Sequence, residues 1–146
     1  MKKIIVFLIC ILWFTGTYAY NDKIVNDTNA LPVKARNFIK KHFPRSDISH
    51  MEEEDGIWLW KKYEVILTDG FDLEFDYKGR WTEVDCQRQP VPVDIIPKKI
   101  YQYVKTNFKD QTIVSIKKED KGYEIQLLNG SELKFDKNEK FLRFDD

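Results

Sequence analysis

Apolar side chains recur with a helical period in two segments of the chain, 31–43 and 96–108. In both segments they return mostly every three or four residues, which places them on one face of a helix. Each segment has a proline near its start, Pro32 and Pro97, where the missing N–H of proline costs nothing. The pattern therefore predicts two amphipathic helices.

A period of two follows each helix. In the stretch 71–77, Phe71, Leu73 and Phe75 alternate with acidic residues, so one face of the strand is apolar and the other is acidic. An antiparallel sheet tolerates this difference, because one face packs on helices while the other meets water. The expected strands cover 47–54, 57–68, 71–77 and 80–86, and then 112–120, 122–128, 131–136 and 139–144.

Glycine marks the turns between the expected strands. Asp69-Gly70 and Asn129-Gly130 are strong two-residue hairpin signals. Both central residues of a type I′ turn need a positive φ, which Asn, Asp and Gly adopt most easily. We therefore expect type I′ turns at both places.

The two halves of the chain repeat one pattern. The stretch 67–81 reads LTDGFDLEFDYKGRW and the stretch 127–141 reads LLNGSELKFDKNEKF. The offset between the halves is 65 residues in the helices and 60 from Tyr63 onward, so the first half has five extra residues near 57–62. A repeat of this kind predicts the architecture before any single element does.

The expected fold is α+β, with two tandem helix-plus-four-stranded antiparallel units and the helices on one face of the sheet. The first unit covers 30–88 and the second covers 89–146, while 20–29 lead into the first. A helix on one small sheet is marginal alone, and two copies can extend one sheet and share its core.

The N-terminus has the pattern of a secretory signal peptide. Lys2 and Lys3 precede an apolar run over 4–14, and small residues precede a cut after Ala19. The run is shorter than the ~20 residues that span a bilayer, and an uncleaved anchor is the alternative. We expect a signal peptide at 1–19, no stable membrane anchor, and a periplasmic or secreted protein.

The charges balance, with 24 basic and 24 acidic residues interspersed along the chain. A nucleic-acid-binding surface needs a basic face, which this composition does not offer. Without its leader the chain keeps one cysteine, Cys86, so no internal disulfide can form. We expect Cys86 to be a buried free thiol, with an intermolecular bridge or a reactive thiol as the alternative.

Motifs of catalysis are missing. The chain has no Gly-x-Ser-x-Gly, His-Glu-x-x-His, phosphate loop or Cys-x-x-Cys, and it has two histidines. Asp72, Glu74 and Asp76 alternate as in a calcium loop, but they lie on an expected strand and lack the loop's glycine and final glutamate. The acidic turn at 52–55 is a weak ion site at most. We expect no catalytic residue, no metal site and no cofactor.

An aromatic recognition surface is the more concrete candidate. Regular alternation through the strand 57–68 places Trp58, Trp60 and Ile66 on the solvent side, and Trp81 lies outward if Val84 points inward. Tryptophan dominates binding hot spots. A bulge would reverse the register and bury these side chains, and the sequence leaves both arrangements open. The candidate partner-binding residues are Trp58, Trp60, Ile66, Trp81 and Phe141, the last being the repeat counterpart of Trp81.

The paired helices LPVKARNFIKKHFP and IPKKIYQYVKTNFK, with the paired meanders YEVILTDGFDLEFDYKGRW and YEIQLLNGSELKFDKNEKF, resemble PepSY-like exported proteins related to the β-lactamase inhibitory protein fold. The resemblance covers nearly all of the chain after its leader. It implies tandem α/β units and relatives that bind a partner protein across the open face of the sheet. Other PepSY domains accompany metallopeptidases as inhibitory or chaperone-like segments. No stretch matches an inhibitory loop, so no target carries over.

The expected function is that of a non-catalytic exported protein-binding module, inhibitor-like in its use of the open face. Its partner is an unidentified protein, with an exported enzyme among the candidates. A structural or chaperone-like envelope module that modulates an exported peptidase is the first alternative, and a weak ion or small-ligand binder is the second. The sequence leaves the oligomeric state open.

Overall fold

The computed structural model describes residues 22–24, 27–54 and 62–145. Its helices are α1 (Val33–His42), α2 (Lys98–Asn107) and a short 3-10 helix, η1 (Thr28–Ala30). Its strands are β1 (Asp22–Ile24), β2 (Ile48–Glu54), β3 (Lys62–Leu67), β4 (Asp72–Asp76), β5 (Trp81–Asp85), β6 (Ile113–Glu119), β7 (Gly122–Leu127), β8 (Glu132–Asp136) and β9 (Phe141–Asp145). The expected signal peptide lies outside the described residues. No helix in the described ranges is long and apolar enough to cross a membrane.

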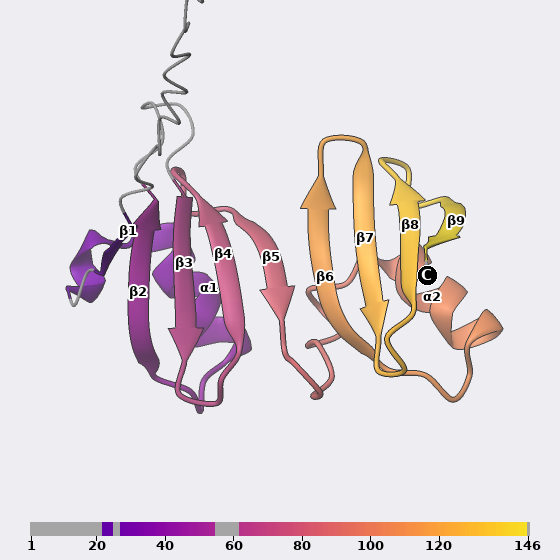
Figure 1. Ribbon diagram of the computed structural model, residues 1–146, viewed down its shortest axis with the longest axis horizontal. Helices are drawn as coiled ribbons and strands as arrows, with labels where there is room; N and C mark the ends of the chain where they lie inside the picture. Colours follow the sequence, from indigo (N-terminus) through magenta and orange to yellow (C-terminus); the bar gives the residue numbers. More distant parts are fainter. Residues whose placement is uncertain (1–21, 25–26, 55–61, 146) are drawn as a thin grey trace, which may run out of the picture.

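Within the described residues, the strands form one antiparallel sheet of nine strands, in chain order from β1 to β9. Figure 1 shows α1 and α2 behind the same side of this sheet, so the near side is open. The α+β class is therefore confirmed. The strands of the two halves do not form separate sheets, because β5 pairs with β6 through Glu83–Lys117, Val84–Ile116 and Asp85–Ser115.

The pairing within β2–β5 has the same pattern as the pairing within β6–β9. A register shift follows the first residue of β2 at Ile48, and another follows Ile113 at the same place in β6. A second shift separates Glu74 from Phe75 in β4, and Lys134 from Phe135 in β8. Bulges bend a strand and change the face on which the side chains beyond them lie. The side chains of both halves are therefore redirected at the same positions.

The core lies between the sheet and the two helices. The helices contribute Ala35, Ile39, Ile100 and Val104, all buried. The sheet contributes alternate residues of its strands, and the largest fully buried side chains there are Phe75, Phe135, Met51, Leu67, Leu73, Ile116, Ile125, Leu127, Leu133 and Val65. Full burial of such a side chain contributes about 1.5–3 kcal/mol, so this layer is the main source of stability.

Cys86 belongs to this core, as expected. Its side chain is fully buried and forms no disulfide. Burial, followed by the charge of Asp85, raises the pKa of the thiol to about 12. The thiolate, which is the reactive form of cysteine, is therefore disfavoured.

The hairpin turns differ from the expected type I′ geometry. Gly70 and Gly130 have positive φ values of 81° and 91°, but Asp69 and Asn129 do not have a positive φ. The Gly70 N–H donates to the Leu67 carbonyl at 2.9 Å, and the Leu67 N–H donates to the Phe71 carbonyl at 2.9 Å. This is the three-residue hairpin loop in which glycine forms a left-handed bulge. The turn positions were predicted correctly and the turn type was wrong.

Candidate functional site

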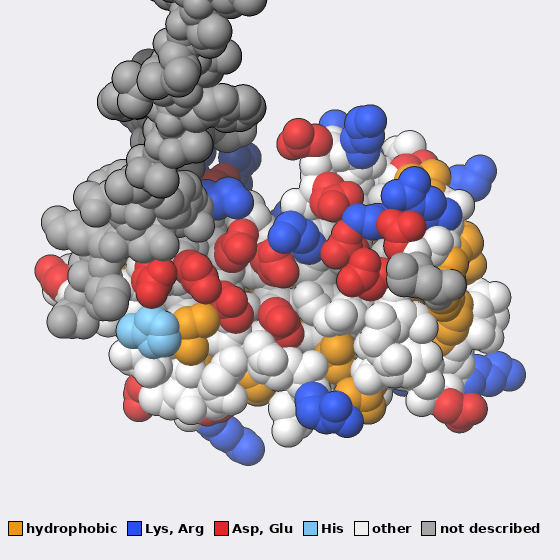
Figure 2. Space-filling model, viewed as in Figure 1, with side chains coloured by type: hydrophobic (Ala, Val, Ile, Leu, Met, Phe, Trp, Pro, Cys, Tyr) orange, Lys and Arg blue, Asp and Glu red, His pale blue; other side chains and the backbone are white. Residues whose placement is uncertain are grey.

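The open face of the sheet carries a row of charged side chains that runs across the strands. Residues in register on neighbouring strands share a face, so the row follows directly from the pairing. From β2 to β9 its members are Glu52, Glu64, Glu74, Glu83, Lys117, Glu124, Lys134 and Arg143. The first half of the row is entirely acidic, and the second half mixes both signs. Figure 2 shows acidic side chains gathered over the first half of this face.

Asp72 and Asp85 extend the acidic half into a second row. They are paired in register on β4 and β5, next to Glu74 and Glu83. We call Glu52, Glu64, Asp72, Glu74, Glu83 and Asp85 the acidic surface. All six side chains are partly exposed, so they meet solvent while lying close enough to repel one another.

The pKa of Asp72 reflects the burial of its side chain first and this repulsion second. Burial, followed by the charges of Glu64, Glu74 and Glu83, raises the pKa of its carboxyl from 3.8 to about 7. Its Oδ1 atom is buried and has no hydrogen-bond partner. A buried, unsatisfied carboxylate oxygen destabilises the fold, and perturbed carboxylates of this kind concentrate at functional sites.

Two lysines flank the acidic surface. Lys117 Nζ lies 2.5 Å from Glu83 Oε2, and Lys62 Nζ lies 3.6 Å from Glu74 Oε2. The hydrogen bond to Glu83 is the main reason that the pKa of Lys117 is raised. These pairs lower the local negative charge at Glu74 and Glu83, whereas no ion pair among the described residues joins Asp72 to a lysine or an arginine.

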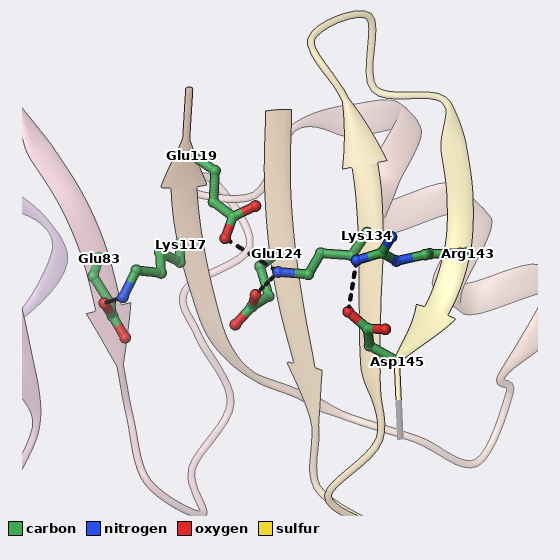
Figure 3. Close-up of polar contacts among 7 residues, drawn as sticks. All are labelled: Glu83, Lys117, Glu119, Glu124, Lys134, Arg143 and Asp145. Atoms are coloured by element: carbon green, nitrogen blue, oxygen red, sulfur yellow. Dashed lines mark hydrogen bonds and ion pairs between the residues drawn. The ribbon is translucent and has the colours of Figure 1, made fainter. Parts of the chain in front are cut away.

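The second half of the row is balanced internally. Lys134 Nζ contacts Glu124, and it lies 3.1 Å from Glu119 Oε1. Arg143 Nη2 lies 3.1 Å from Asp145 Oδ2 on the same strand. Figure 3 shows these contacts side by side with the Glu83–Lys117 pair. Glu119 and Glu124 thus share Lys134 as a basic neighbour.

The two halves differ in charge at matching positions. Glu52 in β2 corresponds to Lys117 in β6, Glu74 in β4 to Lys134 in β8, and Glu83 in β5 to Arg143 in β9. The positions of Glu64, Asp72 and Asp85 keep their sign, as Glu124, Glu132 and Asp145. Three of the six acidic residues therefore have basic counterparts, so the excess of negative charge belongs to the first half and is not a requirement of the fold.

The acidic surface is suited to binding positive charge, but not as a compact metal site. Within the described ranges, no three His, Cys, Asp or Glu side chains are grouped so that they could hold a metal ion. Beside the surface, a shallow hollow of about 480 Å³ is lined by Glu74, Asp76, Arg80, Thr82 and Lys117, among others. Both features are open and polar, which suits contact with another molecule's surface.

Among the predicted partner-binding residues, Trp58 and Trp60 lie outside the described residues. Ile66 lies on the open face, as expected, in register with His50 on one side and Asp72 on the other. It is partly buried and provides an apolar contact beside the acidic surface. The register therefore places Ile66 next to the candidate site.

Trp81 and Phe141 lie on the opposite face, so their expected solvent-facing position is wrong. An extra residue in β5 places Trp81 opposite the buried Phe75, and an extra residue in β9 places Phe141 opposite Phe135. The ring of Trp81 packs 6.3 Å from that of Phe38 in α1. Phe141 stacks on Tyr103 of α2 at 4.8 Å. Both aromatic side chains are partly buried and pack against the edge of the hydrophobic core.

Lys118 covers the outer side of Trp81. Its Nζ lies 3.4 Å from the centroid of the indole ring and donates to the Trp81 carbonyl at 3.2 Å. Burial, followed by the charge of Arg80, lowers the pKa of Lys118 to about 8. This cation–π contact covers the indole ring and makes Trp81 less accessible to a partner on the open face.

A family model described as "Putative beta-lactamase-inhibitor-like, PepSY-like" matches residues 61–143. The chain belongs to the PepSY-like family. The match includes β3–β8, α2 and the first part of β9, and with them most of the acidic surface. No catalytic family is indicated. No curated protein is significantly similar to the chain.

Solved structures of proteins described as periplasmic resemble the chain over most of its length. A "putative periplasmic protein of unknown function" from Bacteroides vulgatus is 40% identical, with a TM-score of 0.83, over 86% of this chain and 100% of that one. A second periplasmic protein from the same species is 41% identical, with a TM-score of 0.81, over 88% and 99% of the two chains. A "putative calcium-regulated periplasmic protein" from Bacteroides thetaiotaomicron is 42% identical, with a TM-score of 0.80, over 86% and 97%.

Proposed function

We propose that this protein is an exported, non-catalytic binding module that recognises a partner protein through lysine and arginine side chains. The partner would contact the acidic surface on the open face of the sheet. The observation that carries the proposal is the strand register, which sets four glutamates of β2–β5 side by side on the open face. The raised pKa of Asp72, caused by burial and then by the charges of Glu64, Glu74 and Glu83, supports it. Repulsion in the free protein would be relieved by a cationic partner, so the acidic surface destabilises the fold in exchange for binding.

The dimensions of the acidic surface favour a protein over a single ion. Neighbouring strands lie about 4.8 Å apart, so the four glutamates of β2–β5 span roughly 14 Å. Calcium gathers its oxygen ligands at about 2.3–2.6 Å, which a row of this width does not provide without rearrangement. Several basic side chains from one partner can each meet one carboxylate, and Ile66 supplies an apolar contact between them.

A periplasmic or secreted location is part of the proposal. The N-terminal pattern of an export signal and the periplasmic descriptions of the solved relatives support it. We further infer that the halves are two copies of one helix-plus-four-strand unit, a reading supported by their matching registers and bulges. The first copy would then have acquired the binding charges. An envelope module that modulates an exported peptidase would use the same surface.

Calcium binding is a second candidate. The relative described as calcium-regulated is 42% identical, and the Asp72 Oδ1 atom has no hydrogen-bond partner. Calcium would then raise the melting temperature of the protein, magnesium would raise it less, and a chelator would reverse the change. An unchanged melting temperature in millimolar calcium would remove this candidate and leave the protein-binding proposal intact.

The binding proposal is tested by affinity capture from the envelope fraction of the producing cells. The bait is compared with a Glu64→Gln, Asp72→Asn double variant and with a Glu124→Gln, Glu132→Gln control at the matching positions of the second half. We expect the wild-type protein and the control to retain a partner that elutes as salt is raised. The amount of this partner recovered on the variant should be at least about tenfold lower. Equal recovery on all three baits, with all three folded, would contradict the proposal.

A further inference from the structure

Strand β9 ends the sheet with its outer edge uncovered within the described part of the chain. Its counterpart in the first half, β5, has β6 beside it. The consequence is visible at matching positions, since Val84 in β5 is 0% exposed and Phe144 in β9 is 43% exposed. Leu142, also in β9, is 57% exposed. An edge strand with exposed apolar residues is a template for pairing with another strand.

The β5–β6 junction shows which kind of strand this edge accepts. There Val84 faces Ile116 on the helix side of the sheet, and Glu83 faces Lys117 on the open side. In β9 the corresponding central residue is Phe144, with Arg143 and Asp145 on either side of it. A complementary antiparallel strand therefore needs an apolar residue opposite Phe144, an acidic residue opposite Arg143 and a basic residue opposite Asp145.

The sequence of β9, read in the opposite direction, meets this requirement. We propose that β9 pairs antiparallel with β9 of a second copy of this chain, about a two-fold axis that passes beside Phe144. Arg143 of each copy then faces Asp145 of the other, and the two Phe144 rings face each other. The two sheets continue into one another, with both pairs of helices on the same side.

Charge selects this register over its neighbours. A shift by two residues keeps the faces aligned but places Arg143 opposite Arg143 of the second copy, and like charges directly opposite destabilise a strand pair. A shift by one residue exchanges the two faces of the added strand, so Phe144 would meet the open side. Only pairing centred on Phe144 satisfies both conditions.

Existing contacts already orient these side chains. Arg143 and Asp145 lie on the open face at the end of the sheet, 3.1 Å apart, as Figure 3 shows. Their side chains are 66% and 41% exposed, so both can turn to a partner. Phe144 stacks on Phe108 at 6.0 Å, which holds its ring on the helix side. The new contact needs no change in the main chain of the described residues.

Sedimentation equilibrium of the purified protein tests the proposal. The interface is short and belongs to the weak size class, so the concentration series should reach roughly 1 mM. We expect a reversible monomer–dimer equilibrium. Arg143→Asp or Asp145→Arg alone should raise the dimer Kd at least about tenfold, because each substitution creates two like-charge contacts across the symmetric pair. Lys40→Asp on α1, an exposed charge reversal elsewhere, should leave the Kd unchanged.

Mixing the two single variants separates pairing from local folding. An Arg143→Asp copy carries two acidic residues at these positions and an Asp145→Arg copy carries two basic ones, so their mixed dimer has only opposite-charge contacts. The mixture should therefore dimerise at least as strongly as the wild-type protein, although the Arg143–Asp145 bridge within each chain is lost. A monomer at every concentration, or single variants that fail to recover on mixing, would overturn the proposal.

Discussion

Replacing Asp72 by asparagine is expected to stabilise the protein at pH 8 by about 1–3 kcal/mol, while leaving its stability near pH 4 almost unchanged. Asparagine has nearly the same shape as aspartate but no charge, so it removes the cost of burying a charge and, after that, the repulsion from the neighbouring glutamates. A pKa raised by about three units corresponds to roughly 4 kcal/mol, and screening of the partly exposed side chain reduces this figure.

The direction of the pH dependence follows from proton binding. The folded protein holds the Asp72 proton up to about pH 7, whereas the unfolded chain releases it near 3.8. Between these values the folded state binds more protons, so the stability contributed by this group falls as the pH rises. Below 3.8 both states are protonated and the wild-type side chain is as neutral as the variant.

Urea unfolding at a series of pH values measures the difference between the two proteins. Glu132→Gln is the matched control, since Glu132 occupies the Asp72 position in the second half, where the neighbouring row carries Lys134 and Arg143 in place of two glutamates. The control should change the free energy of unfolding by less than about 0.5 kcal/mol at every pH. Asp72→Asn with a pH-independent effect, or with destabilisation at pH 8, would contradict the proposed origin of the repulsion.

Replacing Gly122 by alanine is expected to destabilise the protein by about 3 kcal/mol or more. Gly122 begins β7 with a φ of 154°, and a Cβ added there would lie 1.9 Å from the Phe135 carbonyl oxygen and 2.8 Å from Asp136 Cα. These are main-chain atoms of β8, and they cannot yield without separating the two strands. The substitution therefore breaks the ladder between β7 and β8.

Gly130→Ala separates the clash from the backbone preference. Gly130 also has a positive φ, of 91°, but a Cβ added there has no neighbour within 4 Å. This variant should lose only the conformational advantage of glycine, about 1 kcal/mol. Urea unfolding of both variants measures the difference. Equal losses at the two positions would show that β8 does not approach Gly122 as closely as the structure has it.

Local periodicity predicted most of the fold. The segments with a period of 3.6 became α1 and α2, and the alternating stretches became β2 and β4–β9 with boundaries shifted by one or two residues. Leu73 and Phe75 are buried on the helix side, as their alternation with Asp72 and Glu74 indicated. These features depend on residues that are close in the sequence, so the pattern of apolar and polar residues is enough to predict them.

The orientation of Trp81 could not be predicted, because it depends on a bulge. Alternation counted back from Val84 places Trp81 on the open face, and the extra residue in β5 reverses that result. Nothing in the residues 81–85 marks this bulge. A matching extra residue in β9 places Phe141 on the helix side of the sheet.

The acidic surface was missed because it is a property of strand register. Glu52, Glu64, Glu74 and Glu83 are far apart in the sequence and become neighbours only across four paired strands. A signal was nevertheless present in the repeat. Aligning the halves by charge shows that Glu52, Glu74 and Glu83 are replaced by Lys117, Lys134 and Arg143. Repeat positions that invert their charge are therefore candidates for function.

The acidic surface is tested most directly by the titration of Asp72 itself. The side-chain carboxyl carbon of Asp72 is followed by NMR from pH 3 to 9, with Asp72→Asn used to assign the signal. We expect its main transition near pH 7, with smaller steps as the neighbouring glutamates titrate. A single transition near 3.8 would show that the open face has no destabilising concentration of negative charge. The proposed recognition of a cationic partner would then lose its physical basis.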